Sequence, residues 1–407
     1  MTKFHLSAKV MTLFGFMLSS ALFSACSDDG PDFPKPTPTE NPADMITDKD
    51  KLAMIYSLSD LEGDKGRIYE MTYTVDYKLD DALNYEIDGL DRLNSFVANY
   101  LLDKDSDKGI DLSYGAGCSA FACPDSKSGN FLMGRNFDFG HFEPGTKDRI
   151  MIPVIAVHTA PAGGKKSVSF VDGQFVGYRS GFYTDHDSDL STLMALPYLL
   201  LDGINEDGFA ISVLLLDGMP TKQQKSGKKK IFTTVAMRML LDRASTVKEA
   251  VNLLDDYNMC MRLESDSTSY HFLMADATGD FAIVEYTEPD IKKNPSEMEV
   301  LTGNDAFRYV TNFYVSPSMA DTPNGSHIST HGKNRYNNLE KYLQEHNFSI
   351  SSTQALEALK IVAQGPEGPE GMTGFTQWSE VYNLNKKTLT MNILREWDKQ
   401  FTFSVEQ

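Results

Sequence analysis

The sequence predicts a mixed α/β protein whose β-sheets are covered on both faces. Beyond Cys118, apolar runs of strand length dominate the chain. Residues 209–216 carry apolar side chains at nearly every position, as expected for a strand that is buried on both faces. Amphipathic helical segments stand among these runs, so stacked sheets with helices outside account for the order of elements. Composition alone does not choose among the layer arrangements.

The folded part is expected to begin near Lys51. Residues 71–77 alternate between apolar and polar side chains, which predicts a half-buried strand. Apolar residues at helical spacing from Leu90 to Leu101 predict a helix after it. Further strands are expected at 151–158, 167–172, 209–216, 270–275, 281–286 and 388–394, and helices at 232–244, 247–257, 335–345 and 353–363.

Length and charge exclude some classes of function. A chain of 407 residues can bury a large core. The net charge of −19 argues against nucleic acid as a partner, because phosphate backbones need basic surfaces. The basic residues between 222 and 230 are interpreted as a solvated loop.

The N-terminus is predicted to be a lipoprotein signal. Basic Lys3 and Lys9 precede an apolar stretch that is too short to span a bilayer comfortably, and residues 22–26 resemble a bacterial lipobox. Residues 1–25 would then be removed and Cys26 would be lipidated, with residues 26–50 as a Pro-rich, acidic tether. We therefore expect an exported protein, anchored to the bacterial outer membrane. The alternative is an ordinary secretory signal that is cleaved near Ala25.

The cysteines indicate a free thiol. There are four, and once Cys26 carries lipid the remaining three cannot all pair. Cys118 and Cys123 are five residues apart, so on a strand they would point to opposite faces. Cys260 lies in an apolar stretch interpreted as helical and is expected to be a buried core thiol.

A candidate active centre lies around Cys118. This thiol follows Gly-Ala-Gly, and Arg135 and Asp138 follow one strand and one turn later. A thiolate is a strong nucleophile, and a nearby cation makes it more available at neutral pH. These residue types indicate nucleophilic catalysis.

The same stretches resemble a known family. Gly-Cys-Ser-Ala-Phe-Ala, followed by Gly-Arg-Asn-Phe-Asp-Phe, resembles the nucleophile region of the choloylglycine hydrolase and acid ceramidase group of N-terminal-nucleophile (Ntn) hydrolases. The likeness covers roughly residues 67–403 and includes five further stretches in the family's order. They are 201–210, 270–286, 310–313, 332–336 and 376–382. The resemblance implies an α+β fold, a four-layer αββα sandwich.

The resemblance also implies roles for five residues. Cys118 would be the nucleophile, and its free α-amine would be the general base. Arg135 would stabilise the thiolate, and Asp138 would accept a hydrogen bond from the α-amine. Asn312 would donate to the tetrahedral oxyanion, and Arg335 would complete the charge network.

Each residue also has a plainer interpretation. Cys118 could be a core thiol, and Arg135 with Asp138 a structural ion pair. Asn312 could be a turn or cap residue, and Arg335 could lie on the solvated face of a helix.

The chain departs from the family pattern at two places. Leu215 stands where bile salt hydrolases carry asparagine and penicillin V acylases carry tyrosine, so one side-chain oxyanion donor is missing. A long segment also precedes Cys118, as in acid ceramidase. We therefore expect Cys118 to attack the carbonyl of Gly117, which would separate an N-terminal segment, 51–117, from a catalytic domain, 118–407.

These features predict a cysteine hydrolase of linear amide C–N bonds, acting on a small N-acyl compound such as a conjugated bile acid, an N-acyl amino acid, a lipid amide or penicillin V. Transfer of the acyl group to an amine is an alternative. No metal or cofactor is expected, and a homo-oligomer is compatible with the sequence. A surface-exposed binding lipoprotein is the rival from another class. A papain-type protease is disfavoured because His271, its candidate partner, lacks a supporting motif.

Overall fold

The computed structural model describes residues 46–63, 65–102, 116–143, 146, 148–179, 190–217, 222–260, 268–288, 296–365 and 375–406. The expected signal segment, Cys26 and most of the tether lie outside the described residues. The described chain begins with helix α1 (Lys49–Ile55), capped by the Asp48 side chain, so folded structure starts slightly before the expected Lys51.

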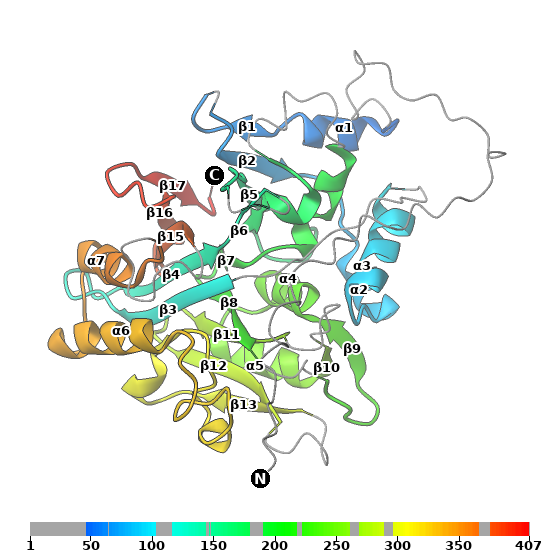
Figure 1. The fold of residues 1–407 in the computed structure, drawn as a ribbon. Coiled ribbons are helices and arrows are strands. Elements are labelled where there is room, and N and C mark those ends of the chain that lie inside the picture. Colours follow the sequence, from blue (N-terminus) through cyan, green and yellow to red (C-terminus); the bar gives the residue numbers. More distant parts are fainter. Residues whose placement is uncertain are drawn as a thin grey trace, which may run out of the picture.

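In the described part of the chain, the larger of two main sheets has nine strands, each of which is labelled in Figure 1. Its strands are mostly antiparallel, but β2 and β5 pair in parallel. In spatial order they are β1 (Ser59–Asp60), β2 (Ile68–Tyr73), β5 (Val154–Thr159), β6 (Ser167–Asp172), β7 (Asp202–Asn205), β8 (Ala210–Asp217), β11 (Thr268–Ala275), β12 (Phe281–Thr287) and β13 (Glu297–Leu301).

The second main sheet has six strands, all paired antiparallel. In spatial order they are β14 (Tyr309–Val310), β3 (Ala116–Pro124), β4 (Phe131–Phe139), β15 (Phe375–Asn383), β16 (Thr388–Ile393) and β17 (Phe401–Ser404). Its strand β3 contacts β8 and β11, so the two sheets pack face to face.

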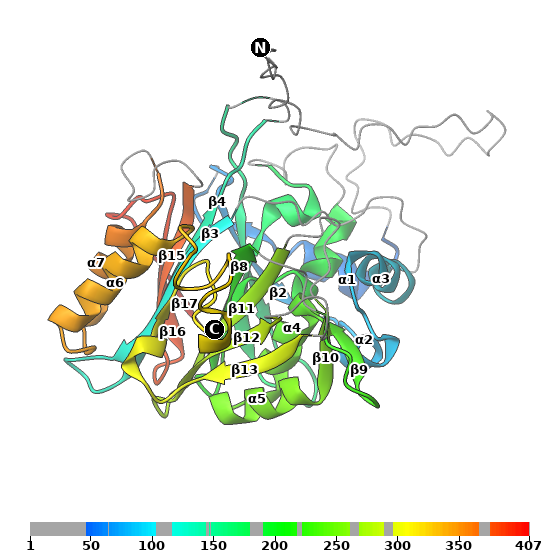
Figure 2. The same ribbon diagram turned by 60° about the horizontal axis from the view of Figure 1, so that its bottom comes forward.

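Helices cover the outer face of each sheet. Helices α6 (Lys333–Glu345) and α7 (Ser352–Val362) pack against each other, and α7 packs on β4 and β15. Helix α4 (Thr233–Arg243) packs on β7 and β8, with α5 (Val247–Asp255) beside it. Figure 2 shows α6 and α7 at the left of the sheets and α4 at the right. The expected four-layer αββα sandwich is confirmed.

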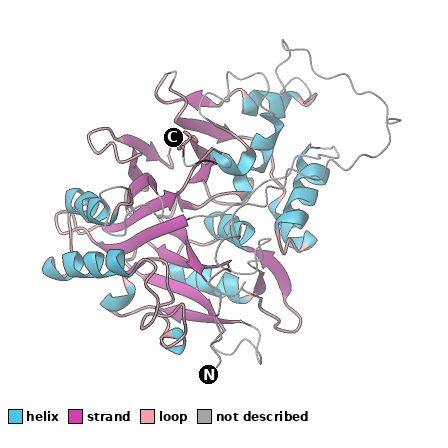
Figure 3. Cartoon of the chain, viewed as in Figure 1, coloured by secondary structure: helices cyan, strands magenta, loops and turns pink. Residues whose placement is uncertain are grey.

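Smaller elements complete the described chain (Figure 3). A two-stranded parallel ribbon joins β9 (Lys229–Phe232) and β10 (Tyr257–Cys260). The helical elements that remain are α2 (Leu79–Tyr85), α3 (Leu90–Phe96), a π-helix at Val97–Leu102, and 3₁₀ turns at Gly173–Val176, Leu190–Tyr198, Asp305–Phe307 and Pro317–Met319. None of the helices in the described part of the chain combines the length and apolar character needed to cross a bilayer.

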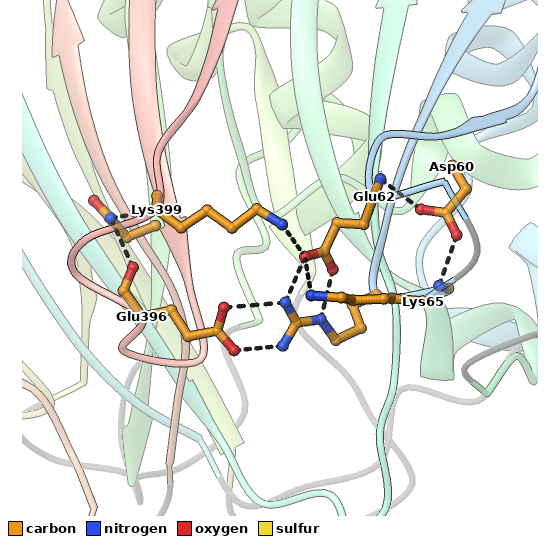
Figure 4. Close-up of polar contacts among 8 residues, drawn as sticks. Asp60, Glu62, Lys65, Glu396 and Lys399 are labelled. Atoms are coloured by element: carbon orange, nitrogen blue, oxygen red, sulfur yellow. Dashed lines mark hydrogen bonds and ion pairs between the residues drawn. The ribbon is translucent and has the colours of Figure 1, made fainter.

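The N-terminal segment belongs to the large sheet. Strand β2 lies between β1 and β5 and is buried at most of its positions. A cluster of charged side chains also joins the β1–β2 turn to the turn between β16 and β17 (Figure 4). In it Arg67 pairs with Glu62 and Glu396, and Lys399 pairs with Glu62. A strand ladder therefore joins the N-terminal segment to β5, and charged side chains join it to the turn between β16 and β17.

Most expected elements are present with boundaries shifted by a few residues. The strand expected at 71–77 is β2, and the helix expected from Leu90 continues as α3 and the π-helix. The expectation that Cys260 is helical was wrong, because it ends strand β10, but it is buried as expected. The basic stretch 222–230 is a loop only in part, since it runs into β9.

Candidate active site

Cys118 lies on β3, at the centre of the interface between the two sheets. Its strand is paired with β4 along its whole length and with β14 further on. The Cys118 side chain is in the core between the sheets, whereas Cys123 is in the smaller cluster beneath α6 and α7. The two thiols thus point to opposite faces, as expected, and both are free.

Arg135 lies on the same face of the small sheet as Cys118 and is fully buried. It forms an ion pair with Asp202 of β7, and its Nη1 donates to the Val213 carbonyl of β8 at 2.8 Å. The alternative of an Arg135–Asp138 ion pair is wrong. These residues are three positions apart on β4, and side chains at an odd spacing on a strand lie on opposite faces.

The local pairing of β8 explains why its carbonyls are available. β7 pairs with β8 only as far as Ser212, so the next residues of β8 lack a neighbouring strand on that side. The Val213 carbonyl accepts from Arg135, and the Leu215 carbonyl accepts from Asn312 Nδ2 at 2.7 Å. These two side chains therefore donate the hydrogen bonds that a neighbouring strand would otherwise donate to the buried carbonyls of β8.

Two buried carboxyl groups face the single guanidinium of Arg135. Glu380 of β15 is directly opposite Arg135 across the strand pair, and the Tyr382 hydroxyl contacts Glu380 at 2.9 Å and Asp202 at 3.2 Å. Burial raises the pKa of Glu380 well above its ordinary value, and the charge of Asp202 raises it further. Burial also raises the pKa of Asp202, against the opposing charge of Arg135. Since Arg135 neutralises one carboxylate, we assign the remaining proton to Glu380.

Arg335 holds the backbone around Cys118 from the helix side. This residue of α6 is fully buried, so the alternative of a solvated position was wrong. Its Nη1 donates to the Cys118 carbonyl at 2.5 Å, and its Nη2 donates to Asn312 Oδ1 at 2.7 Å. Asp138 lies 3.6 Å from Nη1 and accepts from Thr376 Oγ1 at 2.6 Å.

Asn312 contacts the backbone nitrogen of the candidate nucleophile. Its Oδ1 accepts from the Cys118 N–H at 2.8 Å. In the intact chain this nitrogen is an amide whose partner is Asn312, and the hydrogen bond from a free α-amine to Asp138 stays a prediction. One hydrogen of Asn312 Nδ2 is donated to the Leu215 carbonyl, and an amide nitrogen carries two.

A buried histidine and glutamate support the segment that carries Asn312. His271 Nε2 donates to the Thr311 carbonyl at 2.8 Å, and Nδ1 lies 2.9 Å from Glu285. Glu285 also accepts from the backbone nitrogens of Val315 and Ser316. His271 thus positions the chain next to Asn312 and is not a partner of the thiol.

The Cys118 thiol is not activated in the uncut chain. Burial raises its pKa, and the positive charge of Arg135 opposes that rise without cancelling it. The positive charge of Arg135 lowers the pKa of the thiol, in the expected direction, but the effect of burial is larger.

Several residues around Cys118 were assigned no part in this site from the sequence, and His271 was considered only as the partner in a papain-type protease. Asp202, His271 with Glu285, and Thr376 with Glu380 stand inside the stretches that resembled the family, which is the signal that could have drawn attention to them. Asn205, by contrast, is a turn residue. Its side chain binds the backbone at Asp207, Phe209, Leu241 and Ala244.

Leu215 contributes a backbone atom to the site. Its carbonyl fixes the Asn312 amide, while its side chain offers no hydrogen-bond donor. As for metal binding, in the described ranges no three His, Cys, Asp or Glu side chains gather as a metal site would need.

Comparison with known proteins assigns the central part of the chain. The model of the family described as linear amide C-N hydrolases, choloylglycine hydrolase family, matches residues 118–318. No sequence among the curated proteins compared matches the chain.

Similar solved structures include two variants of the conjugated bile acid hydrolase from Clostridium perfringens. The first is 16% identical to this chain and the second is 15% identical, and each has a TM-score of 0.47. Both matches cover 71% of this chain, with 93% of the first structure's chain and 92% of the second's. The penicillin V acylase from Agrobacterium tumefaciens is 17% identical, with 71% of this chain and 87% of that chain covered and a TM-score of 0.46. The similarity to the choloylglycine hydrolase family of linear amide C–N hydrolases thus covers residues 118–318 of this chain.

Proposed function

We propose that this protein hydrolyses a linear amide bond of a small N-acyl substrate through a thioester on Cys118, after cutting its own Gly117–Cys118 bond. The observation that carries the proposal is the convergence of Asn312 and Arg335 on the backbone of Cys118. The match to the family model also begins at this same residue.

The cut would supply the missing base. In the uncut chain the nitrogen of Cys118 is an amide, which binds no proton at neutral pH, and the buried thiol keeps its own. Once Gly117 is released, the same nitrogen becomes an amine on the residue that carries the thiol. It can then accept the thiol proton without a separate histidine.

Turnover would follow in two halves. The thiolate attacks the substrate carbonyl, the second hydrogen of Asn312 Nδ2 stabilises the oxyanion, and the α-ammonium returns the proton to the leaving amine. Water then attacks the thioester with the amine again as base, which releases the acid and restores the thiol. Arg135 would stabilise the thiolate, and Asp138 would orient the amine once it is free to rotate.

The substrate class follows from the family's reaction and the apolar surroundings of Cys118. The thiol lies among aromatic and aliphatic side chains between the sheets, which suits an apolar acyl group. Conjugated bile acids, N-acyl amino acids, lipid amides and penicillin V are the candidates. An amine could replace water as acceptor, since the thioester is the same.

The location of the protein is part of the proposal. The lipobox-like residues before Cys26 and the Pro-rich segment after it support an exported lipoprotein of the bacterial outer membrane. Labelling cells with radioactive palmitate tests this expectation. Incorporation that is lost in Cys26→Ala supports the anchor, and unchanged incorporation contradicts it.

The activity test uses a panel of N-acyl amides that differ in acyl group and amine. We expect release of free amine from at least one member. Brief exposure to that substrate should add the mass of the acyl group to the fragment that begins at Cys118. Release of amine by Cys118→Ala at an equal rate would contradict the proposal. Binding of a panel member without turnover by the self-cleaved protein would favour the rival binding lipoprotein.

A further inference from the structure

The Gly117–Cys118 peptide has different chemistry on its two faces. Cys118 points into the space between the sheets, whereas Gly117 is one strand position earlier and presents its opposite side to the helices. A methyl group on the Gly117 α-carbon would lie 3.3 Å from Arg335 Nη2 and 3.3 Å from Gln364 Nε2. Two nitrogen donors therefore crowd the helix side of the bond.

The direction of attack decides where negative charge develops. The sulfur of Cys118 must approach the Gly117 carbonyl carbon from the side on which its own side chain lies. As the carbon becomes tetrahedral, its oxygen bends away from the incoming sulfur. The oxyanion therefore moves toward the helix side, where Gln364 and Arg335 lie.

Gln364 is built rigidly into this position. It is fully buried just beyond the end of α7. Its backbone nitrogen donates to Thr376 Oγ1 at 2.7 Å, and its carbonyl accepts from the Thr376 nitrogen at 3.2 Å. Thr376 also holds Asp138. The backbone of Gln364 is thus held by β15, and its Nε2 lies beside the Gly117 α-carbon.

We propose that Gln364, together with Arg335, forms an oxyanion site for self-cleavage that is separate from the site used in turnover. The proposal rests on the proposed cut at Gly117–Cys118. In the reaction, Cys118 Sγ bonds to the Gly117 carbonyl carbon and the bond from that carbon to the Cys118 nitrogen breaks. The thiol proton passes to that nitrogen, and water then hydrolyses the thioester to the Gly117 carboxylate and the thiol.

Turnover of a substrate would not use Gln364. After the cut, the Gly117 end no longer occupies the bond position, and a substrate meets the thiol on the side between the sheets. That side holds Arg135 and the Asn312 amide. Gln364 acts once in the life of each molecule, whereas Cys118 acts in every cycle.

The test compares two rates in the same full-length proteins. Intact mass spectrometry follows cleavage in wild type, Gln364→Met and Gln364→Asn, with exposed Gln344→Ala of α6 as the control. Near-UV circular dichroism identifies the folded fraction, on which both rates are measured. Amide turnover is then measured per cleaved molecule.

We expect Gln364→Met to slow cleavage by about 10²–10³-fold, the usual effect of losing one oxyanion donor. Gln364→Asn should cleave at an intermediate rate, and Gln344→Ala as wild type. Turnover per cleaved molecule should change by no more than about twofold in any variant, since the donor is not used in that reaction. Cleavage of both Gln364 variants at the wild-type rate would overturn the inference, as would an equal loss of turnover. A wild-type chain that is never cut at Gly117 would instead overturn the proposed function.

Discussion

Asn312 Oδ1 lies 2.8 Å from the backbone nitrogen of Cys118, so the atom expected to become the catalytic base is already held before any cut. The same oxygen accepts from Arg335 Nη2 at 2.7 Å. One asparagine thereby links the nucleophile's residue, a buried cation and, through the Leu215 carbonyl, the large sheet.

Replacing Asn312 should affect both activity and stability. In Asn312→Ala the oxyanion loses a donor, and kcat should fall by about 10²–10³-fold. The Cys118 nitrogen and the Leu215 carbonyl lose their buried partner, which should cost about 1–3 kcal/mol of unfolding free energy. Denaturant unfolding and steady-state kinetics of the cleaved fraction measure the two effects. A kcat within threefold of wild type would contradict the assigned role.

Glu380 should make stability depend on pH. Its pKa is raised by burial and by Asp202, so the folded chain keeps a proton that the unfolded chain loses near the ordinary glutamate pKa. The free energy of unfolding should therefore fall as pH rises above that value, by about 1.4 kcal/mol per pH unit for one proton, until Glu380 ionises in the folded chain.

Glu380→Gln should remove that slope while keeping activity at neutral pH, because the amide imitates the protonated acid. Urea unfolding across the pH range measures it, with exposed Glu357→Gln as the matched control. An unchanged slope in Glu380→Gln would show that the proton resides elsewhere.

His271 should influence the reaction through Asn312. In His271→Ala the Thr311 carbonyl loses its donor, and the segment leading to Asn312 is free to shift. A displacement of about 1 Å at a reacting group can cost about 10²-fold, so we expect a loss of that order in kcat with little change in KM.

His158 provides the control for His271. His158 is a buried histidine of β5, in another part of the large sheet. Its Nε2 lies 2.8 Å from Oε1 of Glu70 on β2. His158→Ala should lower Tm but leave the kcat of the folded enzyme unchanged. An equal fall of kcat in His271→Ala and His158→Ala would contradict a specific role for His271, because loss of any buried histidine would then have the same effect.

The N-terminal fragment should stay bound after the cut. Strand β2 remains paired with β1 and β5, and the backbone hydrogen bonds and apolar contacts of such a strand pair are not weakened by salt. We expect the fragments to co-elute in 1 M NaCl, because at about that ionic strength the Debye length is only about 3 Å and only charge pairing is weakened. Separation in salt alone would contradict the packing of β2.

The charge cluster in Figure 4 should add an acid-sensitive contribution to that association. The hydrogen bond from Arg67 lowers the pKa of Glu62 to about 2. The stabilisation is complete above the ordinary glutamate pKa and is lost as pH falls toward 2. Tm should therefore fall over this interval, and Arg67→Ala should flatten the fall. An equal fall of Tm with pH in Arg67→Ala would show that other groups cause the acid sensitivity.

Local patterns in the sequence predicted the fold well where one strand or helix determines its own periodicity. The double-sided apolar run of β8 and the opposite faces of Cys118 and Cys123 are of this kind. The resemblance then supplied the layer order and the set of residues that meet around Cys118.

Contacts made only by tertiary packing could not be read from the sequence. The partner of Arg135 is Asp202 on the other sheet, because β7 stops pairing with β8 at Ser212 and leaves room for a side chain. Burial, which no local pattern reports, also raises the pKa of the Cys118 thiol by more than the charge of Arg135 lowers it. Among the described residues, β9 and β10 form a separate two-stranded ribbon, and their short sequences carry little periodicity.

The central claim is that Cys118 becomes an N-terminal residue by its own action. The most direct measurement is N-terminal sequencing of the fragments of purified wild type and Cys118→Ala, produced in parallel. We predict that wild type yields a fragment beginning at Cys118 and that Cys118→Ala remains one intact chain. A wild-type chain that stays whole, or a variant cut at the same bond, would contradict the account.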